Sequence, residues 1–309
     1  MGGTPDKLER IYYGGQAVME GVMIRGPRHM AVAVRHPKGH IVRHSEELRG
    51  VYTGKTRKIP LVRGGIVLWE TLALGMRALS FSSKIAFEEE DEKGETGKFP
   101  EGAFWGSMAV AMVFVAAVFF VAPIFLSNLL ESWDWSRAAI VAVEGVIRLA
   151  FFVLYIWLIG RMREIRRVFQ YHGAEHMTIH AYEAGRPLTP EEVRRFPKEH
   201  QRCGTSFLLV VIVIAFITFF LFDVLVDQGL IVRVISRIVL IPLVAGVSYE
   251  ILRFGARFND RAFVQAMFKP NIALQGLTTK VPEDDQIEVA IASFNAVLER
   301  AAKDDPSVA

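Results

Sequence analysis

The sequence predicts an all-α polytopic membrane protein with four transmembrane helices and a small cytoplasmic part that contains an N-terminal β-hairpin and amphipathic helices. The first observation is composition: the 309 residues are 51% hydrophobic with a mean hydropathy of +0.28, too apolar for an ordinary soluble protein of this size. The second is that the apolar residues gather in runs with few charges, long enough to cross about 30 Å of hydrocarbon. The third is that basic residues flank these runs.

Charge and cysteine content narrow the class further. The net charge of +3 is small, so we expect no nucleic-acid partner, and the lipid bilayer is the predicted environment. A single cysteine excludes an internal disulfide and fits a chain whose ordered parts face a reducing compartment. Residues 1–10 are polar and no apolar segment follows them, so we expect no cleavable signal peptide.

Residues 12–27 (YYGGQAVMEGVMIRGP) are rich in glycine, which predicts an irregular loop. We expect this loop either to present Gln16, Glu20 or Arg25 to a functional site, or to pack against the membrane face. After it, Met30 to Arg35 and His40 to Ser45 alternate as strands do, which predicts a β-hairpin. Its histidines are expected to be exposed rather than ligands: His29, His36, His40 and His44.

Pro60 to Phe87 has the pattern of a helix, but charges recur too often for a membrane span. We expect it to lie at the interface or beside the spans. Glu88 to Gly102 is acidic and contains glycine, which predicts a flexible linker.

Four spans are predicted: Phe104 to Leu130, Ala138 to Gly160, Phe207 to Val226, and Ile231 to Tyr249. The first has 27 residues without a charge, and Pro123 is expected to kink it near its end. The fourth is weaker, because it contains Arg233 and Arg237 and is interrupted by Pro242 and Gly246. Whether it crosses fully is left open.

Lysine and arginine set the predicted orientation. They are abundant before the first span, between the second and third spans, and after the fourth, and scarce in the other turns. Both termini and the segment 161–205 should therefore face the cytoplasm.

The second span contains Glu144 and Arg148, one helical turn apart. Charges inside a membrane are costly, and this spacing lets the two neutralise each other. The pair is either a relay or binding site for a polar group, or a structural pair that faces another span.

The last region should lie in the cytoplasm. Arg253 to Phe268 fits a helix resting on the membrane, and a loop is expected after Pro270. A second helix should begin at Pro282 to Asp285. Its apolar positions follow the helical period: Ile287, Ala290, Ile291, Phe294 and Leu298.

The central functional signal is the stretch Arg161 to Gly185. Read as a helix, it places His172, His176 and His180 on one face. The first two, with Glu175, match the inverted zinc-protease motif, in which two histidines one turn apart bind zinc and the adjacent glutamate handles protons.

Two ligand sets are compatible with this motif. In the first, His200 and Cys203 join the two motif histidines and close a four-ligand structural zinc site. In the second, His180 or the carboxylate of Glu250 completes the shell and leaves one position for water. Zinc or another divalent transition metal suits either set.

The predicted organisation has seven parts: 1–59, Gly-rich loop and hairpin; 60–87, interfacial helix; 88–102, linker; 103–160, first transmembrane hairpin; 161–205, histidine loop; 206–250, second transmembrane hairpin; 251–309, C-terminal helices.

Five stretches together resemble the YqhQ-like family of bacterial membrane proteins: GGQAVMEGVMIRGP, YHGAEHMTIHAYE, RCGTSF, GVSYEILR and IEVAIA. The resemblance covers nearly the whole chain and implies a multi-pass protein of the bacterial inner membrane, in a family sometimes described as metal-dependent. The family often has His-Pro-Arg-Cys where this chain has His200-Gln-Arg-Cys203, so the ligands are kept and the turn between them differs.

Two functions follow as hypotheses. One is a metal-dependent hydrolase at the membrane surface with Glu175 as the base. The other is a non-catalytic membrane scaffold with a structural metal and a protein partner on the cytoplasmic face. A transporter built on the intramembrane pair ranks third, because four spans would need to form a homo-oligomer to enclose a path.

Overall fold

The computed structural model describes residues 13–48, 59–87, 101–129, 135–200, 203–226, 229–258 and 261–304. The chain folds into helices, with all described strands near the N-terminus. The predicted linker 88–102 lies outside the described residues except for Glu101 and Gly102, which begin a helix.

The strands form one antiparallel sheet in the order β1 (Gly14–Val18), β2 (Gly21–Arg25), β3 (His29–Arg35) and β4 (Ile41–Glu47). The predicted hairpin is confirmed as β3 and β4. The irregular loop predicted for residues 12–27 is wrong, because this stretch is a second hairpin, with a tight turn at Glu20, whose φ is +49°. Its glycines serve packing: a side chain on Gly21 would collide with the backbone oxygen of Ala33 on the neighbouring strand.

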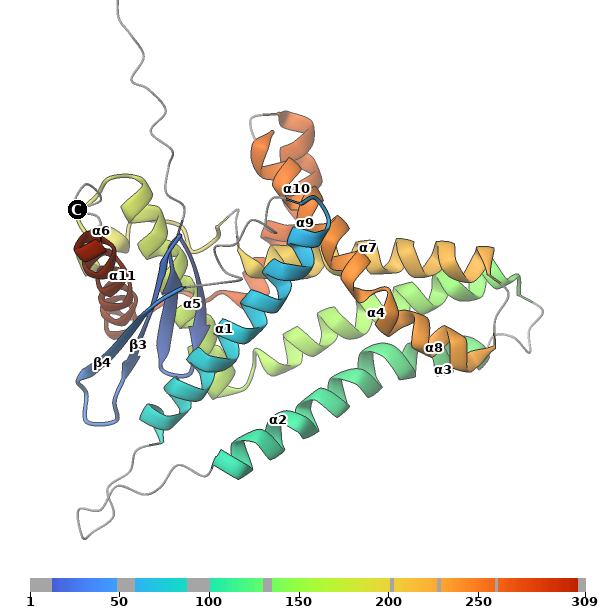
Figure 1. Cartoon of the computed structure of the whole chain (residues 1–309), viewed down its shortest axis with the longest axis horizontal. Helices are drawn as coiled ribbons and strands as arrows, with labels where there is room; N and C mark the ends of the chain where they lie inside the picture. The colour runs from blue at the N-terminus through green and yellow to red at the C-terminus, as the bar shows by residue number, and fades with distance from the viewer. Residues whose placement is uncertain are drawn as a thin grey trace, which may run out of the picture.

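Helices cover both faces of this sheet (Figure 1). One face carries Val22 and Ala33 and packs against α5 (Arg163–Glu183) and α11 (Asp284–Asp304). The other face packs against α1 (Val62–Ala86) through Leu74 and its neighbours. Because both faces are buried, even the central strands carry few charges.

Three segments that are distant in the sequence share this core. Tyr13 from the N-terminal region contacts Tyr182 of α5 and Phe294 of α11, with ring centroids 5.3 Å and 4.9 Å away. Phe294 and Ile287 are completely buried, and burying such a side chain contributes about 1.5–3 kcal/mol. The predicted apolar face of α11 therefore stabilises the part of the molecule that contains the sheet.

The prediction that the hairpin histidines are exposed is wrong for two of them. His29 is only 2% exposed, and its Nε2 lies 2.7 Å from Oδ2 of Asp304 at the end of α11. His36 is also buried and stacks on His40. The prediction fails for His29 because β3, which it begins, lies between β2 and β4 and packs against α11. His36 directly follows this strand, whereas His40 and His44 are exposed as expected.

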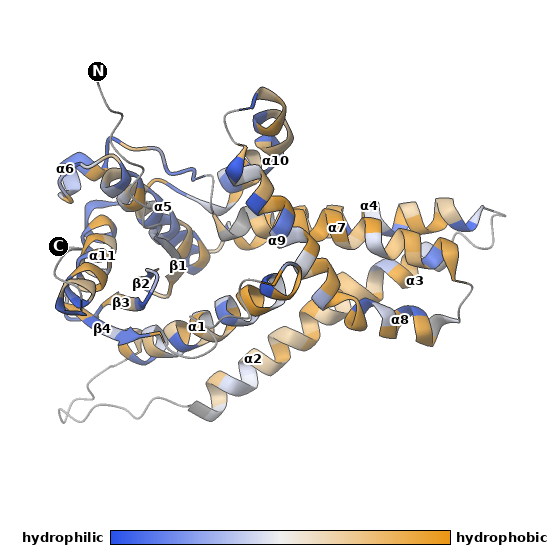
Figure 2. Ribbon diagram, turned by 45° about the horizontal axis from the view of Figure 1, so that its top comes forward, coloured by the Kyte–Doolittle hydropathy of each residue, from blue (hydrophilic) through white to orange (hydrophobic). Residues whose placement is uncertain are grey.

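Within the described part of the chain, three helices are long and apolar enough to span a membrane: Gly102–Ser127, Arg137–Ile159 and Phe207–Leu225. The first is built from α2 (Glu101–Ala116), the π-helical turn η3 (Ala117–Val121) and α3 (Ala122–Asn128); the others are α4 (Arg137–Ile159) and α7 (Gly204–Leu225). These helices form the hydrophobic end of the molecule (Figure 2).

The predicted fourth span is two helices, α8 (Leu230–Val239) and α9 (Ile241–Arg257), bent by 44° at the break. The break at Leu240 comes two residues before Pro242, which cannot donate a backbone hydrogen bond to the preceding turn. Counted as one broken span, the pair brings the total to four; otherwise it is a re-entrant loop.

The C-terminal region differs from the prediction at Pro270. A loop was expected after it, but α10 (Ala262–Thr278) continues through this proline. The residues beyond it, Leu274, Gln275 and Thr278, are buried, and α10 packs against α7. Tertiary packing therefore outweighs the local cost of an interior proline, about 3 kcal/mol. One further short helix, α6 (Pro190–Val193), follows α5.

Helix α1 joins the two ends of the molecule. Its C-terminal half packs on the sheet, while Gly64 near its start lies against Gly246 of α9. Trp69 and Leu72 on its outer side are exposed.

Candidate functional site

Helix α5 begins four residues after α4 ends and carries the histidine motif. Gly173 interrupts this motif with a residue of low helix propensity. Tertiary packing explains why glycine occupies this position: a side chain on Gly173 would collide with the backbone oxygen of Lys280, in the segment that leads to α11. The backbone N–H of Lys280 also donates to the carbonyl of Phe169, 2.8 Å away, so this segment lies directly along α5.

The structure brings His172, His176 and Cys203 together. Their ligand atoms all lie within 4.8 Å of one another, and Nε2 of His172 is 3.2 Å from Sγ of Cys203. A tetrahedral zinc with Zn–N bonds of about 2.0 Å and a Zn–S bond of about 2.3 Å would fit between atoms at such separations. His176 and Cys203 are buried and His172 is half-buried.

Hydrogen bonds orient both imidazoles of this group. Nδ1 of His172 lies 2.9 Å from the carbonyl oxygen of Thr278, and Nδ1 of His176 lies 2.6 Å from that of Lys198. A carbonyl can only accept, so each Nδ1 carries the proton and each Nε2 keeps its lone pair. Histidines that bind metals in proteins are held by this same arrangement.

A second group lies beside the first. His180, Glu183 and His200 also offer ligand atoms that all lie within 4.8 Å of one another. His200 shares this second group with His180, and its ring centroid also lies 5.6 Å from that of His176. The closed set that contains both His200 and Cys203 stays a prediction.

Glu175 is buried at the centre of the motif, with 3% of its surface exposed. Burial raises the pKa of its carboxyl to about 7, and the neighbouring His172 acts in the opposite direction. Its Oε2 lies 3.5 Å from Nε2 of His176 and accepts no hydrogen bond from any described residue. A buried carboxylate oxygen without a donor is costly unless a cation or a proton satisfies it.

Glu175 faces a small cavity that also touches both histidine groups. The cavity is lined by Tyr13, Gly14, Gly15, Glu175, His176, Ile179, His200 and Cys203. Strand β1 closes one side of it with backbone alone, since Gly14 and Gly15 have no side chains to fill the space.

The N-terminal residues predicted to face the site lie elsewhere. Glu20 accepts two 2.6 Å hydrogen bonds from Arg167 of α5 and one of 3.2 Å from the hydroxyl of Tyr171. Gln16 donates to the carbonyl of Thr71 on α1, and Arg25 pairs with a glutamate on the same helix. These side chains fasten the first hairpin to α1 and α5, and none of the three lines the cavity.

Glu250, predicted as an alternative ligand, also lies outside both histidine groups. Its Oε1 accepts a 2.7 Å hydrogen bond from Nε of Arg63 and another from the backbone N–H of Leu61. It therefore ties the start of α1 to α9.

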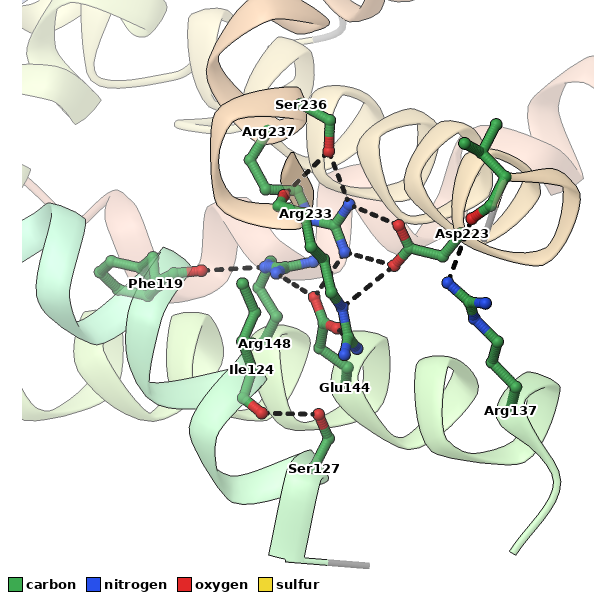
Figure 3. A network of polar contacts seen from close by, with 11 residues as sticks. Phe119, Ile124, Ser127, Arg137, Glu144, Arg148, Asp223, Arg233, Ser236 and Arg237 are labelled. Carbon is green, nitrogen blue, oxygen red and sulfur yellow. Dashed lines mark hydrogen bonds and ion pairs between the residues drawn. The ribbon is translucent and has the colours of Figure 1, made fainter. Parts of the chain in front are cut away.

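A separate polar cluster lies among the spans (Figure 3). Oε1 of Glu144 accepts hydrogen bonds from Arg148 at 2.7 Å and from Arg237 at 3.2 Å. Arg237 also donates twice to Asp223, at 3.0 Å and 2.6 Å. Arg233 bonds Oε2 of Glu144 at 2.5 Å, and all five side chains are buried. The predicted pair is thus part of a network that links α4, α7 and α8.

The first span contributes a backbone group to this network. Pro123 has no N–H, so it cannot donate to the carbonyl of Phe119 four residues earlier, in the π-helical turn. Nε of Arg148 donates to that carbonyl at 2.9 Å. The carbonyl that Pro123 cannot bond within the helix therefore accepts a hydrogen bond from Arg148 inside the apolar bundle.

Sequence reasoning missed Asp223 and Glu183. An aspartate inside an otherwise apolar span is a signal in itself, because such a charge needs a partner in lipid. Glu183 follows His180 by one helical turn and so shares its face, which could have identified it.

Comparisons with known proteins give matches over most of the chain. A family model described as "Protein of unknown function (DUF1385)" matches residues 59–300. The "Uncharacterized protein YqhQ" of Bacillus subtilis (strain 168) is 37% identical over 300 residues, which are 93% of this chain and 92% of that protein. No solved structure matches.

Proposed function

The chain belongs to the YqhQ-like DUF1385 family, and we propose that it is a metal-dependent hydrolase of the bacterial inner membrane with its site on the cytoplasmic face. One observation carries this proposal. The buried Oε2 of Glu175 has no hydrogen-bond donor among the described residues, and it lies 3.5 Å from the lone-pair nitrogen of His176, at a cavity shared with Cys203.

The ligand set supports a catalytic metal. His172, His176 and Cys203 supply three ligands, and catalytic zinc sites keep three protein ligands and one open position. Two imidazoles and a thiolate suit zinc among the common divalent metals. When bound, such a metal lowers the pKa of a coordinated water towards neutrality.

Glu175 would act as the general base. A carboxyl whose pKa lies near 7 takes a proton from a water molecule and returns it to a leaving group at the pH of the cytoplasm. Gly15 and the other cavity walls exclude bulk water from this carboxyl. The hydrolysis then needs no partner beyond water and a substrate whose scissile bond reaches the cavity.

The position of the site favours a substrate at the membrane surface. Helix α5 follows the second span after a short turn, and Cys203 immediately precedes α7, the third span. The metal ligands would therefore lie close to the ends of two spans. The arginines around residues 161–167 favour the cytoplasmic side for this surface.

A structural metal site is the second candidate. The small size of the cavity favours it. The hydrogen bonds of two α5 histidines to other segments also favour it: His176 bonds the carbonyl of Lys198, and His172 bonds that of Thr278. In that case the metal would stabilise a scaffold that binds a protein partner.

One variant separates the two functions. Glu175→Gln removes the base but none of the three ligands, so a hydrolase should keep its metal and its melting temperature and fail to complement a deletion strain. Loss of a general base typically costs about 10² to 10⁴ in rate. Glu164→Gln, exposed in the first turn of the same helix, is the matched control and should behave as wild type.

The ligand variants complete the experiment. His172→Ala and Cys203→Ala should each lower the metal content per chain, measured on protein purified without chelator. Full complementation by Glu175→Gln, together with loss of metal and of thermal stability in the ligand variants, would overturn the hydrolase in favour of a structural site.

A further inference from the structure

We propose that a second divalent transition metal binds at His180, Glu183 and His200, so that one face of α5 carries a two-metal centre. This inference deepens the proposed function and rests on the metal at His172, His176 and Cys203. Its first support is that two imidazoles and a carboxylate converge, with all three ligand atoms within 4.8 Å of one another. Such a set suits zinc, iron, manganese or nickel.

The histidine rings form a continuous row across the two groups. Ring centroids of His172 and His176 are 4.4 Å apart, those of His176 and His200 are 5.6 Å apart, and those of His200 and His180 are 4.5 Å apart. The row follows from helix geometry, because residues four apart on α5 share a face. His200 enters the row from the segment that leads to α7.

The ligands of the second group are held in place as those of the first are. Nε2 of His180 lies 2.8 Å from the carbonyl oxygen of Glu199, so Nε2 carries the proton and Nδ1 keeps the lone pair. The side chain of Gln275, which is completely buried, fixes the backbone of His200 from both sides: it accepts from its N–H and donates to its carbonyl, each at 2.8 Å.

His200 and Cys203 are close in the chain, but they supply ligand atoms to different groups. The backbone N–H of Cys203 donates to the carbonyl of His200 at 3.3 Å, which holds the two residues near each other. His200 and Cys203 also line the same cavity as Glu175. Both groups therefore contribute ligands to the wall of this cavity.

An ion pair is the competing explanation for part of this geometry. Oε2 of Glu183 lies 3.7 Å from Nε2 of His200, and the glutamate is partly exposed. Such a partly exposed pair stabilises a fold only weakly and needs no metal. The ion pair does not involve His180, whose Nδ1 keeps a lone pair while its Nε2 donates to the Glu199 carbonyl.

The test counts metals and distinguishes them by their ligands. The full-length protein, purified in detergent and stripped with a chelator, is titrated with cobalt(II), and bound metal is measured per chain. Only the first group contains sulfur, so only its cobalt should give a thiolate-to-metal charge-transfer band. We expect two cobalt ions per chain, one of which produces this band.

Glu183→Gln is the decisive variant, because the residue is at the surface and the change is isosteric. It should lower the content from two metals to one and leave the charge-transfer band unchanged. Glu191→Gln, an exposed glutamate on α6, is the matched control and should retain both metals. Cys203→Ala should abolish the band and leave the second metal bound.

The possible failures are distinct. One metal per chain with the band present, unaffected by Glu183→Gln, would overturn the second site and leave the proposed function standing. Loss of both metals in Glu183→Gln would mean a single mixed site and would also overturn the inference. No band and no bound metal in the wild-type protein would overturn both proposals.

Discussion

The backbone of Gly15 lies directly against the carboxylate of Glu175. A methyl group on Gly15 would stand 2.8 Å from both Cγ and Oε1 of Glu175, and 2.6 Å from the carbonyl oxygen of Met23 on the neighbouring strand. Strand β1 therefore shapes the environment of the motif glutamate without contributing a side chain. This contact joins the N-terminal strands to α5, two of the three segments that share the core around the sheet.

Gly15→Ala should displace Glu175 and strain the pairing of β1 with β2. We expect a loss of about 1–3 kcal/mol, typical of overpacking, and loss of complementation. Gly14→Ala is the matched control: no atom lies within 4 Å of a methyl group there, and the variant should behave as wild type. Thermal unfolding of both variants in detergent measures the difference. Equal stability of the two would contradict the contact.

The crossing of α1 and α9 offers a second matched pair. A methyl group on Gly64 would stand 2.6 Å from Cα of Gly246, whereas one on Gly65 would meet nothing within 4 Å. Gly64→Ala should therefore separate the helices and lower the melting temperature. Gly65→Ala should leave it unchanged or raise it, because alanine is favoured over glycine in helices by up to about 1 kcal/mol. The reverse order would show that the two helices do not cross here.

The buried network should be sensitive to the loss of a carboxylate. Three guanidinium groups pair with the carboxylates of Glu144 and Asp223, so Asp223→Asn leaves Glu144 as the one carboxylate that the described ion pairs give these three buried cations. Breaking a buried pair in this way costs about 3–5 kcal/mol. Unfolding in detergent should report the loss, while Arg137→Ala, at an exposed arginine bound to the carbonyl of Val226, should cost little.

A compensating change tests whether charge is the cause. Adding Arg237→Met to Asp223→Asn returns the cluster to one excess positive charge, as in the wild type, and should recover part of the lost stability. No recovery would mean that the specific geometry of Asp223, and not the charge balance, stabilises this end of the bundle.

Topology is the fourth prediction. Single cysteines introduced as Arg194→Cys and Ser307→Cys should be protected from a membrane-impermeant thiol reagent in intact cells, and Trp133→Cys should react. The native Cys203 is buried and should give little background. Labelling of Arg194→Cys from outside would reverse the orientation and place the histidine groups on the other side of the membrane.

The sequence by itself determined the helices that can span a membrane and the helix that carries the histidines. Both depend on local properties: a run of apolar residues long enough for the hydrocarbon, and a spacing that puts His172 and His176 on one face. The amphipathic period of α11 likewise identified Phe294 as a core residue, since burial on one face of a helix follows from position along it.

Only the tertiary structure decided how distant segments meet. Glycine-rich residues 12–27 are typical of a loop, yet residues 14–18 and 21–25 pair as strands, and two of their glycines lie where only backbone has room: Gly15 against Glu175 of α5 and Gly21 against Ala33 of β3. The spacing of His200 and Cys203 suggested one shared site, whereas in the structure their ligand atoms fall in two neighbouring groups.

The charge network shows the same limit. Glu144 and Arg148 are close in the sequence and their contact could be predicted, whereas their bonds to Arg233, Arg237 and Asp223 join residues on three helices. Local propensity carries no information about such contacts. They depend on the rotation and offset of each helix against its neighbours, which are set by packing across the whole bundle.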